Sequence, residues 1–424
     1  MNTGVEMPNT RPWPEMSFWR LVFLALVGAG SVATILRFTR GLGAATNLSD
    51  QFPWGLWIGF DVLTGVGLAA GGFTITAVVY IFNLKRFTPI IRPTVLTAFL
   101  GYLFVIFGLM VDLGQPHRIW HALVMWNPRS VMFEVAWCVM LYTTVLALEF
   151  SPIVFERLNL ERPRRIMRAI SVPLVIVGVI LSTLHQSSLG SLYLIVPEKL
   201  HPLWYSPLLP VFFFTSAIAA GLAMVIVESY LCQRAFNHHL AIDLLEPLGR
   251  AMVVVLSVYG ILRLQDLARR GALAGLRQPD YEGTMFLLEM GLGVLLPILL
   301  LAIPRIRGTQ PGLVTGAFLA VLGFVMNRMN VSVTGMERAV GATYLPYWLE
   351  FAVSLGLVAG GFAIFGLAVR YLLIFPEGFH AVRRAEPPAW LVAQPAWGFA
   401  DGSSAPSTGE STAEAPRPGG PYRL

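Results

Sequence analysis

Ionisable and amide side chains lie inside the long apolar segments of this sequence, where such groups are costly and are candidates for function. If consecutive segments run in opposite directions, most of these groups lie toward one membrane face: Arg37, Asp61, Asp112, Glu134, His185, Arg263, Asp266, Glu289, Asn327, Arg328, Asn330 and Glu350. Fewer lie toward the other face: Arg20, Glu149, Glu228, Arg250 and Arg370. The pattern predicts a functional polar site near one face. The alternative is a set of interhelical ion pairs that only fix the packing.

The densest motif is DLGQPHRIWH at residues 112–121. Its Gly and Pro residues terminate a helix, so we expect Asp112, Gln115, His117 and Arg118 to converge at the helix end. A carboxylate beside an imidazole can transfer protons, because His titrates near neutral pH. For His117, a direct role and a purely interfacial hydrogen bond are both open.

A second motif, HQSSLG at residues 185–190, closes another apolar segment. Four successive polar side chains at membrane depth are costly without partners. They either line a cavity for a polar head group or cap the end of the helix.

Neither a metal site nor a haem is expected in this chain. His121 follows His117 by four residues, but the nearby Gly and Pro disfavour the helix that a metal-binding pair would need. A bis-His haem needs two facing imidazoles, and only His185 of the seven histidines falls within a predicted helix. Cys138 and Cys232 are too few for a four-cysteine iron–sulfur or zinc site. No CxxCH haem-attachment motif occurs.

The elements that position these residues are ten apolar segments, each long enough to cross a bilayer. Of the 424 residues, 55% are hydrophobic and 13% are charged, whereas soluble domains carry about 25% charged residues. None of the segments shows the period-two alternation of membrane strands. We therefore predict an all-α, polytopic membrane protein and exclude a soluble enzyme or a nucleic-acid binder. The predicted spans are 17–38, 55–82, 93–112, 130–150, 166–187, 207–230, 246–266, 284–303, 313–330 and 346–374.

The distribution of Lys and Arg predicts the orientation. The loops at 83–92, 151–168, 231–249 and 304–312, together with both termini, contain 16 of these residues, and the opposite loops contain 8. Cytoplasmic loops are enriched in Lys and Arg, so we expect both termini in the cytoplasm and the polar layer near the outer face. The predicted organisation is a cytoplasmic segment at 1–16, a transmembrane domain at 17–375 and a disordered cytoplasmic tail at 386–424.

Several motifs resemble those of a known family. The sequences WGLWIGFD at 54–61, AAGGF at 69–73 and DLGQPHR at 112–118 resemble the NrfD/polysulfide-reductase membrane subunits. MFE at 132–134 and HQSSLG at 185–190 resemble its HybB branch, the quinone-reactive membrane subunits of periplasmic nickel–iron hydrogenases. The resemblance covers about residues 15–375.

The resemblance implies two four-helix bundles, helices 2–5 and 6–9, with helices 1 and 10 added at the flanks. It implies that the chain holds no haem or iron–sulfur cluster and that menaquinone or ubiquinone binds near the periplasmic face as the substrate. It also implies a periplasmic, ferredoxin-like iron–sulfur subunit as partner. The catalytic partner would be a nickel–iron hydrogenase, a molybdopterin enzyme or a multihaem cytochrome.

On this basis the sequence predicts a quinone site and a proton path. His117, oriented by Asp112, or else His185, would hydrogen-bond a quinone carbonyl, and Arg118 would stabilise negative charge there. Proton-path candidates are Asp61, Glu134, Arg263, Glu289 and Arg328 in the outer half, with Glu228 and Arg250 in the inner half. Two other classes are open: a secondary transporter, for which the pairs Gly71–Gly72 and Gly360–Gly361 hint at broken helices, and a purely structural membrane anchor.

Overall fold

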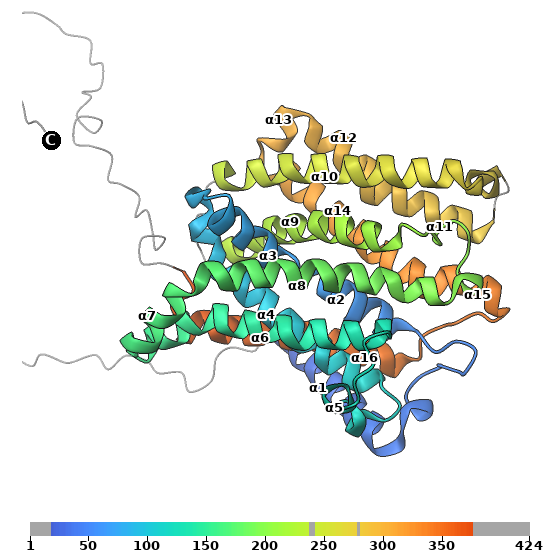
Figure 1. Ribbon diagram of the computed structural model, residues 1–424, viewed down its shortest axis with the longest axis horizontal. Coiled ribbons are helices and arrows are strands. Elements are labelled where there is room, and N and C mark those ends of the chain that lie inside the picture. The colour runs from blue at the N-terminus through green and yellow to red at the C-terminus, as the bar shows by residue number, and fades with distance from the viewer. Residues whose placement is uncertain (1–17, 237–241, 278–279, 376–424) are drawn as a thin grey trace, which may run out of the picture. The chain divides into compact units, whose positions relative to one another are not determined.

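The computed structural model describes residues 18–236, 242–277 and 280–375, which belong to one compact unit of the chain. The predicted segments at 1–16 and 386–424 lie outside these residues. No strand occurs in the described part, and it contains ten helical spans that are long and apolar enough to cross a membrane. The chain is therefore a multi-pass, all-α membrane protein, as the sequence predicts. Figure 1 shows the long helices lying alongside one another, with the connecting segments gathered at their ends.

All ten predicted spans are found, and most are longer than predicted. They are Phe18–Arg40, Trp57–Ile81, Lys85–Asp112, Val131–Arg157, Ser171–Ile195, Leu209–Phe236, Ile242–Arg269, Tyr281–Ala302, Gln310–Val340 and Trp348–Tyr371. The main helices are α1 (Phe18–Arg40), α4 (Thr88–Asp112), α6 (Val131–Arg157), α8 (Ser171–Leu192), α9 (Leu209–Phe236), α10 (Ile242–Arg269), α14 (Gln310–Met329) and α16 (Trp348–Tyr371). Helices extend beyond their apolar stretch because the charged residues at their ends can reach the interface.

Two boundaries differ in a way that matters for the site. The sequence predicts that one helix begins at Pro93, but α4 begins at Thr88 and carries Pro93 near its start. The sequence predicts that the HQSSLG motif closes its helix, but α8 continues to Leu192 and contains the whole motif. The motif therefore does not cap a helix end, because its hydroxyl groups bond back to carbonyls of the preceding turn, as Ser188 does to Leu184 (2.8 Å).

The second span is interrupted, as its Gly71–Gly72 pair hinted. It consists of the π-helical η2 (Trp57–Thr64), α2 (Gly65–Leu68), α3 (Gly71–Thr76) and the π-helical η3 (Ala77–Ile81). A Cβ on Gly221 of α9 would lie 2.6 Å from the backbone N of Gly71, so the two backbones meet through glycines. The other pair, Gly360–Gly361, lies within the unbroken α16.

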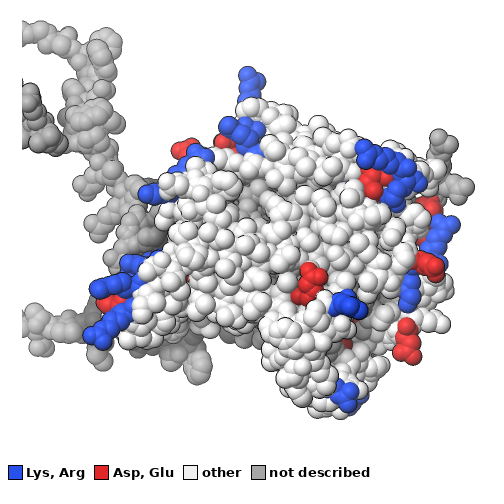
Figure 2. Space-filling model, viewed as in Figure 1, with Lys and Arg blue, Asp and Glu red and all other residues white. Residues whose placement is uncertain are grey.

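The packing brings distant parts of the sequence together. Helix α1 packs against α16, α6 packs against both α4 and α8, and α9 packs against α8, α10 and α14. The grouping into two four-helix bundles stays a prediction. On the face shown in Figure 2, Lys, Arg, Asp and Glu gather mainly near the ends of the helices, with a broad uncharged belt between them. A belt of this kind is expected of a surface that faces lipid.

Candidate functional site

The polar layer predicted from the sequence separates into three clusters of side chains. The Glu289 cluster joins α9, α10, α11 (Tyr281–Met290), α14 and the segment that follows α14. The peripheral cluster joins α1, α4, α16 and the second span. The α4–α6–α8 column lies among the three helices in its name. The two ends of the helical spans are called the Asp112 side and the Arg168 side, after a residue that lies at each end.

The Glu289 cluster is a buried hydrogen-bond network. Glu289, in α11 (Tyr281–Met290), is 1% exposed. Its Oε1 accepts from Asn327 Nδ2 (2.7 Å), and its Oε2 accepts from Trp204 Nε1 (2.8 Å) and Asn330 Nδ2 (2.8 Å). The π-helical η10 (Asn330–Thr334) begins directly after α14 and carries Asn330. Every oxygen of this buried carboxylate therefore has a donor, which is the arrangement that makes a buried charge tolerable.

The two buried arginines of this cluster are held by hydrogen bonds from their terminal nitrogens and by aromatic contacts, and the Nε atom of each makes no hydrogen bond within the described residues. Arg328 donates to Asn327 Oδ1 (2.6 Å) and Ser216 Oγ (3.0 Å), and its guanidinium lies 3.7 Å from the centre of the Phe213 ring. Arg263 donates to the carbonyl of Leu203 (2.9 Å). Cation–π contacts of this kind are strongest where water is excluded.

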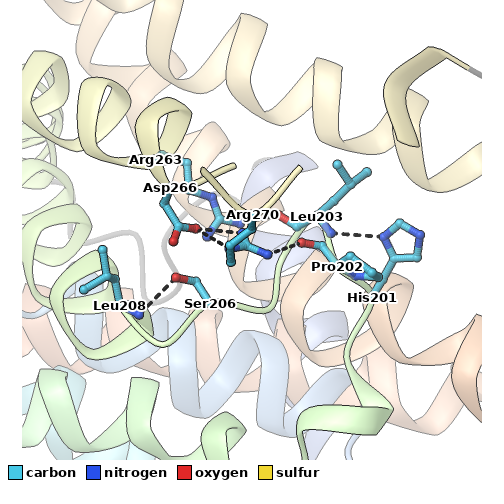
Figure 3. A network of polar contacts seen from close by, with 8 residues as sticks. All are labelled: His201, Pro202, Leu203, Ser206, Leu208, Arg263, Asp266 and Arg270. Atoms are coloured by element: carbon cyan, nitrogen blue, oxygen red, sulfur yellow. Dashed lines mark hydrogen bonds and ion pairs between the residues drawn. The ribbon is translucent and has the colours of Figure 1, made fainter. Parts of the chain in front are cut away.

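The loop between α8 and α9 closes this cluster on the Asp112 side (Figure 3). Arg270 donates to the carbonyl of Pro202 (2.9 Å) and pairs with Asp266 (2.7 Å), which ties the loop to α10. His201 Nδ1 accepts from the Leu203 N–H (3.3 Å), and burial lowers the pKa of His201. The bonds connect protein groups to one another, so the Glu289 cluster has the character of a structural core.

The peripheral cluster contains Asp61 and Asp112. Asp61 Oδ2 accepts from Ser354 Oγ of α16 (2.6 Å). Asp112 ends α4 beside Arg37, which donates to the carbonyls of Val111 (2.6 Å) and of the residue after Asp112. The Asp112 Oδ1 atom is buried and makes no hydrogen bond within the described residues.

Glu350 completes the peripheral cluster as a helix cap. Its Oε1 accepts from the backbone N–H groups of Asn47 and Tyr347 (3.0 Å each), and its Oε2 accepts from the Tyr344 hydroxyl. Burial and this bond to Glu350 raise the pKa of Tyr344. A carboxylate at a helix N-terminus stabilises the exposed N–H groups there.

Among the three clusters, the α4–α6–α8 column contains the most buried polar atoms without a hydrogen-bond partner in the described residues. The Tyr102 hydroxyl and His185 Nδ1 share a hydrogen bond of 2.9 Å, and both residues are fully buried. Ser182 lies next to the hydroxyls of both Tyr102 and Tyr142. The hydroxyls of Tyr142 and Ser182, together with His185 Nε2 and Gln186 Oε1, make no hydrogen bond within the described residues. Unpaired groups of this kind are expected where water or a ligand enters.

Both ends of the column lead to acidic residues. Toward the Asp112 side, Ser188 donates to Glu134 Oε1 (2.6 Å), and Glu134 is exposed near the start of α6. Toward the Arg168 side, Gly178 separates Tyr142 from Glu149: a Cβ on this glycine would lie 3.7 Å from the Tyr142 ring and 3.5 Å from Glu149 Oε1. Glu149 in turn lines a cavity of about 480 Å³. This cavity is bounded by the Arg168-side ends of four spans and includes Tyr80, Arg92, Glu156, Arg168 and Ser171.

The structure does not gather the predicted quinone residues at one point. Gln115, His117 and Arg118 are exposed beyond the end of α4, whereas His185 is fully buried in the column. The segment after Arg118 contains the short α5 (His121–Val124) and presents large exposed apolar side chains. These are Trp120, Leu123, Val124, Met125 and Trp126.

Aromatic contacts hold this segment against α6. Trp137 Nε1 donates to the carbonyl of Ala122 (2.9 Å), and the Trp126 and Trp137 rings lie 4.8 Å apart. Glu134 lies at the Asp112-side end of the column and three residues before Trp137 on α6. The exposed motif and the buried column thus meet at the start of α6.

The predicted inner pair, Glu228 and Arg250, is not brought together. Arg250 pairs with Glu246 on an exposed part of α10 (3.1 Å). Glu228 instead lines a cavity between α4, α9 and α16. Among the described residues, no group of three or more His, Cys, Asp and Glu side chains has the arrangement of a metal site.

The residues of the column that sequence reasoning missed are Tyr102, Tyr142 and Ser182, and Glu149 was noted only as an inner-half acid. Helical spacing offered a signal, because Ser182, His185 and Gln186 lie three or four residues apart on one face of α8. Tyr142 and Glu149 likewise lie seven residues apart on α6. Tyr102 carried no such signal on its own helix.

Comparison with known proteins identifies the family. The sequence profile described as "Polysulphide reductase, NrfD" matches residues 44–339. A protein of Nitratidesulfovibrio vulgaris (Hildenborough) is 44% identical, with 78% of this chain and 87% of the relative covered. The probable Ni/Fe-hydrogenase 2 b-type cytochrome subunit of Escherichia coli K12 is 32% identical, with 86% and 92% covered.

A third relative is the integral membrane subunit of menaquinone reductase from Nitratidesulfovibrio vulgaris (Hildenborough), which is 29% identical, with 86% of this chain and 93% of the relative covered. The family match covers the spans that carry the Glu289 cluster and the α4–α6–α8 column, and the comparisons confirm the resemblance found in the sequence motifs. This chain belongs to the NrfD (polysulphide reductase) family of integral membrane proteins.

Proposed function

We propose that this chain is the quinone-reactive membrane subunit of a multi-subunit oxidoreductase in a bacterial inner membrane. The names of the relatives, a hydrogenase subunit and a menaquinone reductase subunit, support this class. The excess of Lys and Arg in the loops of the Arg168 side supports a cytoplasmic location for that side and for both termini. The Asp112 side then faces the periplasm.

The electrons would come from, or pass to, an extrinsic partner on the periplasmic side. A ferredoxin-like iron–sulfur subunit fits this role because the quinone exchanges two electrons and no redox centre is expected in this chain. The catalytic subunit beyond it would be a hydrogenase, a molybdopterin enzyme or a multihaem cytochrome. The substrate would be menaquinone or ubiquinone.

The quinone head group would bind where the exposed motif meets the start of α6. His117 and Arg118 are exposed there, and the neighbouring apolar segment around α5 offers contact for a lipid-soluble ring. Glu134 and Ser188 lie at the entrance to the column. Asp112 and Gln115 complete the predicted set from the end of α4, with His185 placed deeper as a proton donor.

The observation that carries the proposal is the α4–α6–α8 column. Reduction of a quinone to a quinol takes up two protons, and protons that come from the Arg168 side need a route through the protein. Hydroxyl and imidazole groups of Tyr142, Tyr102 and His185 form a series between the carboxyl groups of Glu149 and Glu134. The unpaired atoms along this route are the positions where waters would complete a relay. Arg263, Glu289 and Arg328, which the sequence also predicts for the path, belong to the Glu289 cluster and not to this column.

Binding of a quinol analogue tests the proposal. The purified chain should quench the fluorescence of 2-heptyl-4-hydroxyquinoline N-oxide in a saturable manner. Replacing His117 or Arg118 with Ala should weaken binding about tenfold, the loss expected for one strong hydrogen bond. Arg338→Ala is the matched control, because Arg338 is an exposed arginine on the same side that pairs with Asp280 (3.4 Å). Absence of saturable binding by folded protein would refute the proposal.

A further inference from the structure

A cavity outside the α4–α6–α8 column lies between α4, α9 and α16, and we call it the α16 groove. It has a volume of about 570 Å³, within the range of ligand-binding sites. Its lining consists of apolar side chains and glycines, except for Thr97, Glu228, Cys232 and Arg234. Three of the lining side chains, Leu231, Val358 and Phe362, are also exposed on the lipid-facing surface. The groove is therefore open to a molecule dissolved in the bilayer.

Glu228 is the chemically distinctive group of the groove. It is only 7% exposed, and neither of its carboxyl oxygens makes a hydrogen bond within the described residues. Thr97 of α4 and Cys232, one turn along α9, are its polar neighbours. The guanidinium of Arg234 lies at the exposed end of α9 and donates to the Tyr230 hydroxyl (3.3 Å). An unpaired, buried carboxyl group is costly, and a hydrogen-bonding partner entering the groove would remove that cost.

The groove continues toward the Asp112 side. A second cavity of about 160 Å³ contains Asp61 and shares four lining residues with the first: Gly101, Phe104, Val358 and Gly361. A Cβ on Gly361 would lie 3.4 Å from the Phe104 ring, so the glycine allows that ring to lie against the α16 backbone. The two cavities together form an elongated slot, which suits a long, narrow ligand.

The chemistry of the slot selects the class of ligand. Phospholipid acyl chains carry no group that can bond to Glu228. Glu228 lies eight residues before the end of α9, about 12 Å along the helix, which is deeper than a lipid head group prefers. A ligand that fits must combine an apolar body with an uncharged oxygen at this depth.

We propose that the α16 groove is a second quinone-binding site, with the prenyl tail extending along α16. A quinol hydroxyl donates a hydrogen bond to a carboxyl oxygen of Glu228 there, and a quinone carbonyl accepts one from the protonated carboxyl group. This inference rests on the proposed function for its ligand class. The α16 groove is a different place from the quinone site of the proposed function, because α9 and α16 contribute nothing to the site at the start of α6. The groove holds the molecule close to the protein within the lipid and requires no electron transfer there.

Photolabelling of the purified full chain in lipid nanodiscs tests the second site. The probe is an azidoquinone with a short prenyl tail, and labelled peptides are located by mass spectrometry. We expect label within 97–104, 224–236 and 358–365 as well as near the start of α6. Gly361→Leu should fill the slot and reduce groove labelling about tenfold. Gly366→Leu is the matched control on the same helix, because no atom lies within 4 Å of its added Cβ.

Glu228 is tested by two substitutions. Glu228→Leu should lower groove labelling about tenfold, whereas Glu228→Gln, which keeps a hydrogen-bonding group, should change it about twofold at most. Labelling restricted to the start of α6, or groove labelling that Gly361→Leu leaves unchanged, would overturn the second site and leave the proposed function intact. No labelling anywhere in a chain shown by circular dichroism to be folded would contradict both.

Discussion

Substitution of Glu289 distinguishes a structural network from a proton path. Glu289→Gln keeps one oxygen, which can still accept from Trp204 and Asn330 if the new amide faces Asn327. One buried donor then loses its acceptor, at a cost of about 1–2 kcal/mol. Glu289→Ala removes the acceptor for all three donors and should cost about 3–6 kcal/mol in the free energy of unfolding.

The assay is unfolding of the purified chain by sodium dodecyl sulfate, followed by circular dichroism and by tryptophan fluorescence, since Trp204 lies in the network. Glu134→Ala is the control: Glu134 is exposed and accepts a single bond, from Ser188, so its loss should cost less than about 1 kcal/mol. Equal losses for the Gln and Ala variants at position 289 would show that the charge, and not the three hydrogen bonds, stabilises the cluster. A loss below about 1 kcal/mol for Glu289→Ala would refute the network itself.

Three further predictions concern the column and the loop that closes the Glu289 cluster. Tyr102→Phe removes the hydroxyl that bonds to His185. It should slow quinone-coupled proton uptake by the complete complex in proteoliposomes about 100-fold and leave the affinity for the quinol analogue unchanged. An unchanged rate of proton uptake would exclude this relay. Gly178→Leu should block the gap between Tyr142 and Glu149 and slow uptake similarly, whereas Gly366→Leu should not. Burial lowers the pKa of His201 below its ordinary value of about 6.5, so its contribution to stability is present above that value and lost as the pH falls through the lowered one. Hydrogen exchange in the surrounding loop, corrected for the intrinsic pH effect, should therefore rise on acidification in the wild type more than in a His201→Gln variant, and equal rises would refute this reasoning.

Composition and periodicity determined the class of this protein and the number of its spans. Ten long apolar segments leave few alternatives, because backbone groups in a bilayer must be satisfied within helices. The end of α4 at Asp112 could also be predicted from the sequence, because Gly114 and Pro116 follow it. The helix around His185 was predicted too short, because polar residues in a row suggest an end. Serine hydroxyls that bond to the preceding turn allow α8 to continue to Leu192.

Only the tertiary structure decided how the polar residues are grouped. Sequence gives the depth of each residue, but depth does not reveal which helices are neighbours or which way a side chain points. The packing unites Glu289 with Asn327, Asn330 and Trp204 in a satisfied network, and it leaves Glu228 unpaired in a groove. Residues at the same depth thus have different roles, because a buried polar group is defined by the partners that the fold brings within hydrogen-bonding distance.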